Sequence, residues 1–254
     1  MMDSSYIIAI DSIIPMRKEP SDASEMVSQL LFGELAIVTD TDKQWLNITC
    51  QHDNYSGWID NKMVYKISAS FYTHFSENFL LQMEPVRQLK TPWGPMFTVM
   101  NSRFPSLEGA FEFEKINFQW TGTPLPFQSK EISEIARMYL NAPYLWGGRS
   151  LFGIDCSGFT QLIYHFKNIL LPRDASLQVN IGKNLNFNNS TVGDLAFFHN
   201  SSGKVTHVGI IIEDKKIIHA SGRVRIDFLT EEGIFNREKN KLTHELHSIK
   251  RILD

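Results

Sequence analysis

The chain has 254 residues, of which 43% are hydrophobic and 21% charged, and its formal net charge is −3. This composition is typical of a globular protein and excludes a disordered or fibrous chain, while the slightly negative charge argues against a nucleic-acid partner. Because the length exceeds the usual size of one domain, we expect two or more compact units.

No run of about 18 apolar residues occurs, so the sequence predicts no helix that spans a membrane. The first eleven residues lack the basic region and the long apolar core of a secretory signal, and we expect no export signal in the chain as given. Two cysteines, Cys50 and Cys156, are too few for a disulfide scaffold. Free thiols and a cytoplasmic location are therefore predicted.

The first region, residues 1–68, has short β-prone runs separated by turn-forming clusters. The runs are residues 7–10, 34–38, 45–49 and 57–59. They predict a small all-β barrel. Residues 24–32 fit either a helix or a strand, because their apolar positions follow a helical period only over a very short window.

The second region, residues 69–126, repeats this character. Proline and glycine punctuate aromatic, β-prone segments such as 96–100 and 111–120, which predicts a second small β domain. A linker rich in turn formers at residues 121–126 then leads to a segment of different composition.

The third region, residues 127–254, begins with helical periodicity. From residue 130 one apolar face is formed by Ile132, Ile135, Ala136, Tyr139 and Leu140. A second helix is predicted to begin near Cys156 and to continue until Pro172 ends it. Strand-like runs follow at residues 194–199, 205–212, 216–220 and 247–253. Helices followed by strands predict an α+β fold.

Cys156 has the surroundings of a nucleophile. Gly147 and Gly148 precede it and Gly158 follows it, so that backbone and substrate can come close to the sulfur. The start of a helix also favours the thiolate, because the positive end of the helix dipole lowers the thiol pKa. Cys50 ends a strand pattern without such a loop and is predicted to be structural.

A nucleophilic cysteine needs a base and a group that orients the base. His165, nine residues after Cys156, falls on the opposite helix face and is excluded. His207 and His219 lie in consecutive strands joined through residues 213–215. With a three-residue loop His219 pairs with Gly209 and becomes a diagonal neighbour of His207, whereas a four-residue loop would put the two histidines on opposite faces.

This pairing predicts a Cys-His-His arrangement in which His207 is the base and His219 orients it. His199 is expected in a surface loop. Two residues separate His244 from His247, one fewer than in the zinc-binding His-Glu-x-x-His motif. We predict no metal site and no cofactor.

Five ordered motifs resemble those of the NlpC family of papain-like cell-wall peptidases. They are residues 144–148 (Tyr-Leu-Trp-Gly-Gly), 155–158 (Asp-Cys-Ser-Gly), 193–198 (Gly-Asp-Leu-Ala-Phe-Phe), 207–210 (His-Val-Gly-Ile) and 218–220 (Ile-His-Ala). The resemblance covers the chain from about residue 127 onward. Residues 15–17 and 55–59 resemble a bacterial SH3-like domain, and the second β region resembles another more weakly.

The resemblance implies a γ-D-glutamyl-L-diamino-acid endopeptidase that acts on murein peptides with the sequence L-Ala-γ-D-Glu-diamino acid. It does not indicate which diamino acid is preferred. It implies that Tyr144 lies near the oxyanion site, that Asp155 and Ser157 line the pocket for D-Glu, and that Trp146 contacts the substrate.

The resemblance also implies residues that hold the amine of L-Ala. Asp174 matches an acidic residue after the nucleophile helix, and a carboxylate suits an ammonium group. The family has a serine directly after that aspartate, where this chain has an alanine, and Ser176 is the expected substitute. From the SH3-like domain, Tyr55 and a glutamate, Glu25 in preference to Glu19, are expected at the same end of the pocket.

The leading hypothesis is thus a monomeric cytoplasmic peptidase that recycles murein peptides. One alternative is an amidase or acyltransferase that uses the same thiolate on a lipid or a sugar-linked amide. Another is a non-catalytic protein whose SH3-like domains bind peptidoglycan, and the complete Cys-His-His set argues against it.

Overall fold

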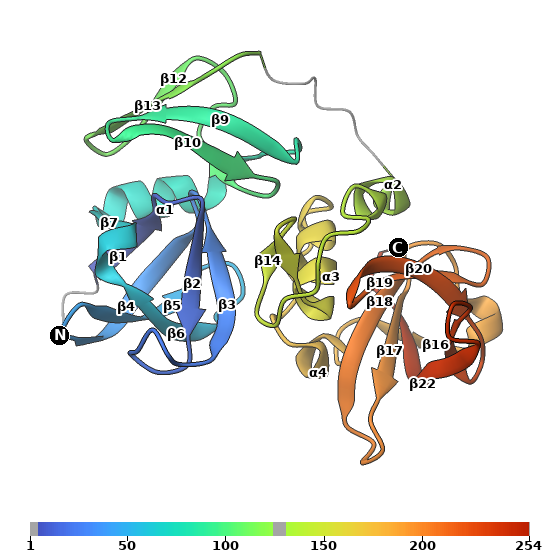
Figure 1. Ribbon diagram of the computed structural model, residues 1–254. Coiled ribbons are helices and arrows are strands. Elements are labelled where there is room, and N and C mark those ends of the chain that lie inside the picture. Colours follow the sequence, from blue (N-terminus) through green and yellow to red (C-terminus); the bar gives the residue numbers. More distant parts are fainter. Residues whose placement is uncertain (1–4, 124–130, 254) are drawn as a thin grey trace. The chain divides into compact units, whose positions relative to one another are not determined.

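The computed structural model describes residues 5–123 and 131–253, which form two compact units (Figure 1). The first unit contains the described residues up to 123 together with Arg149–Leu151, and the second contains residues 131–148 and 152–253. Residues 124–126 of the predicted linker, and the predicted domain start at 127, lie outside the described residues.

The first unit begins with an antiparallel sheet in the order β3-β2-β6-β5-β4-β1-β7. Its elements are β1 (Ser5–Ala9), β2 (Ile13–Arg17), β3 (Met26–Leu31), β4 (Leu35–Asp42), β5 (Trp45–Cys50), β6 (Ser56–Asp60), η1 (Asn61–Met63) and β7 (Val64–Ile67). Branched apolar residues on alternate positions, such as Ile14, Ile48 and Ile59, meet in one buried cluster. The strands predicted in this region are confirmed, and the ambiguous segment 24–32 contains strand β3 rather than a helix.

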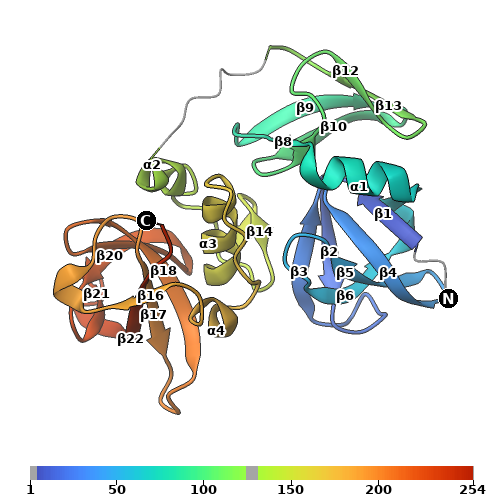
Figure 2. The ribbon, with the colours of Figure 1, turned by 180° about the vertical axis from the view of Figure 1, so that it is seen from behind.

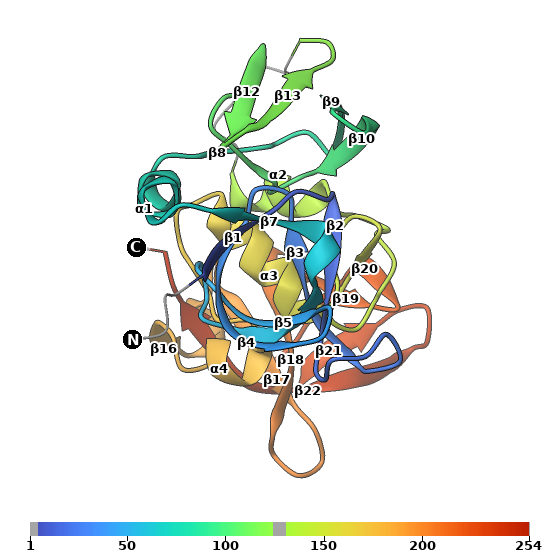
Figure 3. The same cartoon turned by 90° about the vertical axis from the view of Figure 1, so that its left-hand side faces the viewer.

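The remainder of the first unit contains a helix as well as strands (Figure 3). Its elements are α1 (Ala69–Glu77), β8 (Leu80–Leu81), β9 (Val86–Thr91), β10 (Gly94–Val99), β11 (Arg103–Phe104), β12 (Ala110–Phe113) and β13 (Ile116–Trp120). Helix α1 was not expected from the sequence. Phe32, which follows β3, stacks on Phe104 and Phe113 at centroid distances of 5.1 and 5.3 Å. The two β regions therefore share one aromatic core, and a separate second SH3-like domain stays a prediction.

The second unit is built from short helices and a curled antiparallel sheet (Figure 2). Its elements are α2 (Ile132–Arg137), β15 (Gly153–Ile154), α3 (Cys156–His165), α4 (Ala175–Gln178), β16 (Lys183–Leu185), η2 (Phe187–Asn189), β17 (Leu195–His199), β18 (Val205–Glu213), β19 (Lys216–Ser221), β20 (Arg223–Leu229), β21 (Gly233–Asn236) and β22 (Lys241–Arg251), while β14 (Arg149–Ser150) groups with the first unit. Among the described residues, no helix is long and apolar enough to cross a membrane.

The strands β17 to β22 close into a barrel, because β21 pairs with β22 as well as with β20. Apolar side chains from all of these strands meet inside it, among them Phe198, Ile211, Ile217, Leu229 and Ile234. Helix α3 packs against β18 and β19. The barrel thus provides a rigid support for whatever side chains stand on β18, β19 and β20.

The hairpin of β18 and β19 has the register that the sequence predicts at the histidines. Gly209 pairs with His219, as expected. The loop itself differs, since Glu213 already pairs with Lys216 and a bulge between Ile211 and Glu213 restores the register. A two-residue turn plus a bulge therefore gives the same pairing as the predicted three-residue loop.

Other expectations for the second unit need correction. Helix α2 ends at Arg137, so Leu140 is not on its buried face and is 38% exposed. Helix α3 ends at His165 rather than at Pro172, because Asn168 adopts a left-handed backbone with φ of 57°. Sheet dominates the chain and the helices are short. The α+β class therefore describes the second unit only, and only loosely.

Candidate active site

Cys156 is the first residue of α3, and its position is fixed by the residue before it. Asp155 is the N-cap, whose carboxylate accepts the Gly158 N–H at 2.7 Å. The same carboxylate accepts the N–H of Gly147 at 2.9 Å and so ties down the preceding loop. Position 148 requires glycine, because a Cβ there would lie 2.4 Å from the Gly153 carbonyl oxygen.

Arg173 completes the support of the predicted nucleophile and was not predicted from the sequence. Its guanidinium is 2% exposed and donates to both Asp155 oxygens, at 3.0 and 2.5 Å, and to Ser157 Oγ at 3.1 Å. Both oxygens of Asp155 therefore already accept hydrogen bonds from the protein. Substrate contacts by Asp155 and Ser157 stay a prediction, and such contacts would have to share these atoms.

The thiol of Cys156 is buried, being 6% exposed, and this changes its expected electrostatics. Burial, followed by the Asp155 carboxylate, raises the pKa of Cys156 to about 12, although the backbone N–H groups of Val208 and Ser157 and the Arg173 guanidinium act in the opposite direction. The lowered pKa predicted from the helix start is therefore wrong for the resting thiol. The contributions that favour the thiolate are present but are outweighed by desolvation.

The thiol lies beside the strand that carries the predicted base. Cys156 Sγ is 3.9 Å from the Thr206 carbonyl oxygen, and the N–H of Val208 also points to it. These two residues flank His207 in β18. Cys50, by contrast, is a buried free thiol in the first unit next to Met16, in agreement with a structural role.

His207 and His219 are brought together as expected. His207 Nε2 and His219 Nδ1 are 2.8 Å apart, and the rings are 7% and 1% exposed. Gly209 leaves the room that this contact needs, since a Cβ at that position would lie 2.8 Å from the His219 Cβ. Burial and the neighbouring His219 and His244 hold the pKa of His207 well below its usual value, so the ring is neutral at rest.

Asp227 extends this pair into a chain of three polar side chains. Its Oδ2 is 3.1 Å from His219 Nε2, and Arg225 and Asn236 also donate to it. Asp227 was not predicted from the sequence, because strand β20 was not expected. The alternation of Val224, Ile226 and Phe228 was the available signal for that strand.

His244, from β22, forms a third histidine of the cluster. Its ring stacks on that of His207 with a centroid distance of 4.3 Å and an angle of 22°. One nitrogen of each of His207, His219 and His244 lies within 4.8 Å of the others, which is the spacing of a candidate metal site. The stacked rings and the direct His207–His219 hydrogen bond do not direct the lone pairs to one point, so this arrangement does not favour a metal.

Tyr144 and Trp146 lie on the loop before the nucleophile. The backbone N–H of Tyr144 bonds to the Gly222 carbonyl at 3.0 Å, and burial together with Cys156 and Asp155 raises the pKa of its phenol to about 12. Trp146 is 60% exposed. Their contacts with substrate stay predictions.

The residues predicted to hold the substrate amine are divided between the units. Asp174 is the N-cap of α4 in the second unit, and Ser176 is an exposed residue of the same helix. Tyr55 precedes β6 in the first unit, and Glu25 lies 3.7 Å from Lys18 in the same unit. That these four residues act on one substrate group stays a prediction.

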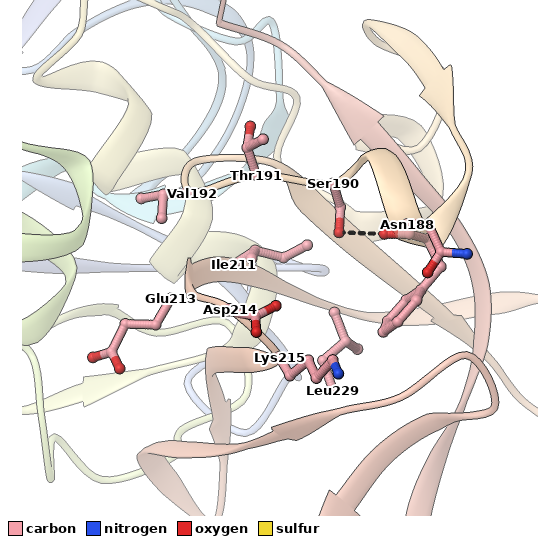
Figure 4. Close-up of a pocket in the computed structure, with 10 residues that line it drawn as sticks. Asn188, Ser190, Thr191, Val192, Ile211, Glu213, Asp214, Lys215 and Leu229 are labelled. Atoms are coloured by element: carbon pink, nitrogen blue, oxygen red, sulfur yellow. Dashed lines mark hydrogen bonds between the residues drawn. The ribbon is translucent and has the colours of Figure 1, made fainter.

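A cavity in the second unit lies away from these residues. Figure 4 shows it between the 188–192 segment and the β18–β19 turn, with Glu213, Asp214 and Lys215 on one side. The hydrogen bond drawn in it joins Ser190 Oγ to the Phe187 carbonyl oxygen at 2.7 Å. None of the predicted site residues is among its described lining residues.

Comparison with known proteins supports the resemblance. The NlpC/P60 family model matches residues 141–241, and the bacterial dipeptidyl-peptidase SH3 domain model matches residues 16–63. A γ-D-glutamyl-L-lysine dipeptidyl-peptidase of Bacillus subtilis (strain 168) is 28% identical over 83% of this chain and 78% of its own length. A protein of the same name from Bacillus cereus (strain ATCC 10987) is 27% identical over 79% of this chain and 68% of its own length.

The fold has a solved counterpart. The crystal structure of an NlpC/P60 family protein from Bacillus cereus ATCC 10987 matches 98% of this chain and 100% of its own, with a TM-score of 0.77 and 21% identity. This match shows the NlpC/P60 papain-like fold with an SH3-like domain. Residues 16–63 thus correspond to a bacterial SH3 domain, and residues 141–241 correspond to an NlpC/P60 domain.

Proposed function

We propose that the protein is a cysteine peptidase that hydrolyses the γ-D-glutamyl–diamino acid bond of murein peptides with a free N-terminal L-Ala. The observation that carries the catalytic part is the thiol of Cys156, held at a helix start against the two residues that flank His207, with His207 in turn bonded to His219. The names of the relatives support the substrate.

The geometry gives each group a step. His207 Nε2 is occupied by His219, so its Nδ1 is the atom that takes the Cys156 proton. The thiolate attacks the carbonyl carbon of the γ-D-glutamyl bond, and the backbone N–H groups at the start of α3 stabilise the oxyanion. His207 returns the proton to the leaving amine, and water then hydrolyses the thioester.

The basic experiment follows release of the diamino acid by mass spectrometry. We expect wild-type protein to cleave L-Ala-γ-D-Glu-L-Lys or its diaminopimelate analogue, Cys156→Ala to be inactive, and the matched variant Cys50→Ala to stay active. Turnover of a lipid or sugar-linked amide in place of the peptide would favour the amidase alternative. Binding of peptidoglycan without any cleavage would favour the non-catalytic alternative.

Recognition of the L-Ala amine is a separate part of the proposal. An ammonium facing carboxylates such as Asp174 gains charge-assisted hydrogen bonds that an N-acetylated peptide cannot make. Wild-type protein should therefore cleave the free peptide much faster than the acetylated one. Asp174→Asn should reduce this preference about tenfold or more through KM, whereas Asp214→Asn, in the β18–β19 turn, should leave it unchanged. Equal cleavage of free and blocked peptides by the wild type would refute this recognition.

A cytoplasmic location and a monomeric state complete the proposal. A peptidase that needs a free N-terminal L-Ala suits short peptides already released from the wall, and its thiol stays reduced in the cytoplasm. Cell fractionation with an antibody against the chain, and light scattering of the purified protein, test these two points.

A further inference from the structure

The chain of polar side chains behind His207 ends in a charged and well-held carboxylate. Asp227 is 5% exposed, and its Oδ2 faces His219 Nε2 at 3.1 Å. Arg225 donates to both of its oxygens, through Nε at 2.8 Å and Nη2 at 3.2 Å, and Asn236 donates to Oδ2 at 3.4 Å. The carboxylate therefore cannot turn away from His219 without losing these donors.

An ionised carboxylate only accepts hydrogen bonds, and this determines which ring nitrogens of His219 and His207 carry a hydrogen. His219 Nε2 must carry its hydrogen to donate to Asp227, so in the neutral ring His219 Nδ1 has none. His219 Nδ1 then accepts the hydrogen bond from His207, and the hydrogen at the 2.8 Å contact belongs to His207 Nε2. The remaining nitrogen of the neutral His207 ring, Nδ1, is left without a hydrogen.

We propose that Asp227 is a positioning residue that acts through His219 to hold His207 in the tautomer whose Nδ1 accepts the Cys156 proton. The proposal rests on the proposed function of Cys156 and His207. When the S–H bond breaks and the Nδ1–H bond forms, His207 becomes a cation beside a thiolate. The negative charge of Asp227 then stabilises that cation through His219, which keeps both of its own nitrogens in the same state.

The charged and titratable groups around His207, His219 and Asp227 come from β20, β22 and the turn before β22. Arg225 of β20 is held by Asp227 and also by Glu238 at 3.1 Å, so its charge is shared between two carboxylates. His244 of β22 stacks on His207, and burial lowers the pKa of His244 to about 4, which keeps it neutral at the pH of the experiment. Lys239 also lowers the pKa of His244. Asp227 is thus the charged group nearest to His219 that stabilises a protonated His207.

The test measures alkylation of Cys156 by iodoacetamide as a function of pH, which requires no substrate. In Asp227→Ala the tautomer is no longer fixed and the imidazolium loses its counter-charge. We expect the alkylation rate at neutral pH to fall about 100-fold and the pH at which the thiolate appears to rise. Asp227→Asn should lose less than about tenfold, because three donors at the Oδ2 position outweigh the one at Oδ1 and orient its amide oxygen toward His219.

Two controls separate positioning from a loss of structure. Asp194→Ala removes another buried carboxylate of the same unit, which lies directly before β17 and accepts from Arg251 at 2.9 and 2.7 Å. This variant should leave the pH profile unchanged. In a His219→Ala background, Asp227→Ala should cause no further loss, because its effect passes through His219. Additive losses, or a wild-type pH profile in Asp227→Ala, would overturn the proposal.

The same measurements keep the two proposals distinguishable. If the wild type shows a His207-dependent alkylation profile but cleaves no murein peptide, the substrate assignment fails and the role of Asp227 is still decided. Nitrogen NMR of the histidine rings adds a direct readout. It should show His207 and His219 both protonated at Nε2 in the wild type and mixed tautomers in Asp227→Ala.

Discussion

Replacing Glu34 by glutamine should strongly destabilise the first unit, because the Glu34 carboxylate neutralises the buried positive charge of Arg149. Arg149 donates to both Glu34 oxygens at 2.7 and 2.9 Å, and the Leu31 N–H reaches the carboxylate at 2.9 Å. Glu34 is 0% and Arg149 1% exposed. Solvent therefore cannot take the place of the carboxylate when its charge is removed.

The expected loss of unfolding free energy follows from the burial of the ion pair and from the lowered pKa of Glu34. Removing one partner of a buried ion pair costs about 3–5 kcal/mol, because the other charge stays buried. Burial raises the pKa of Glu34, but Arg149, His52 and Arg103 outweigh it and lower the pKa from 4.5 to about 2. At about 1.4 kcal/mol for each pKa unit, the folded state favours the ionised form by roughly 3 kcal/mol.

The sign of the pH dependence follows from the lowered pKa. The stabilisation by Glu34 is fully present above the unfolded pKa of about 4.5 and is lost as the pH falls toward the folded pKa of about 2. The difference in unfolding free energy between wild type and Glu34→Gln should thus be about 3 kcal/mol at pH 7 and roughly half of that at pH 3.

Urea unfolding followed by tryptophan fluorescence measures this difference, since Trp45, Trp58, Trp93 and Trp120 all belong to the first unit. The matched control is Glu25→Gln, at an exposed glutamate 3.7 Å from a lysine, which should change stability by less than about 1 kcal/mol. A loss below 1 kcal/mol for Glu34→Gln at pH 7, or one that does not change with pH, would refute the reasoning.

Two further predictions concern the second unit and its thiol. Burial raises the pKa of both thiols, but Cys156 can pass its proton to His207, whereas Cys50 lies beside Met16. Iodoacetamide should therefore label Cys156 well before Cys50; peptide mass spectrometry measures both, and equal labelling would contradict the assignment of the nucleophile. Gly209→Ala should reduce peptide cleavage by about tenfold or more, since its Cβ would lie 2.8 Å from the His219 Cβ; unchanged kcat would show that His219 is not held as described.

The strands were more predictable from the sequence than the helices. Branched and aromatic residues at alternate positions identify strands such as β5 and β18 locally, without knowledge of the partner strand. Helix α1 was missed because its aromatic residues, Phe71, Tyr72 and Phe75, also suit a strand. The signal that could have found it is Ser68, whose side chain caps the helix by accepting the Phe71 N–H.

The candidate site was predictable only where short spacings decide the geometry. The pairing of Gly209 with His219 follows from a hairpin, so the contact between His207 and His219 could be deduced. Asp227 stands on β20, which pairs with β19 as the next hairpin along the chain. His244 reaches the same place through closure of the barrel, which depends on the pairing of β21 with β22. No local pattern encodes the pairing of β21 with β22, so the place of His244 in the cluster needed the folded structure.

The raised pKa of Cys156 leads to one account of its activation. A lone thiolate at this position would be a buried charge beside the Asp155 carboxylate, and the start of α3 does not offset that cost. Transfer of the proton to His207 creates two opposite charges at once, which costs less than a single buried charge. The helix start therefore positions the sulfur, whereas the thiolate depends on the base and on the groups behind it. In the mechanism that we propose, the Asp227 carboxylate behind His219 is what lets a neutral, buried imidazole accept the proton.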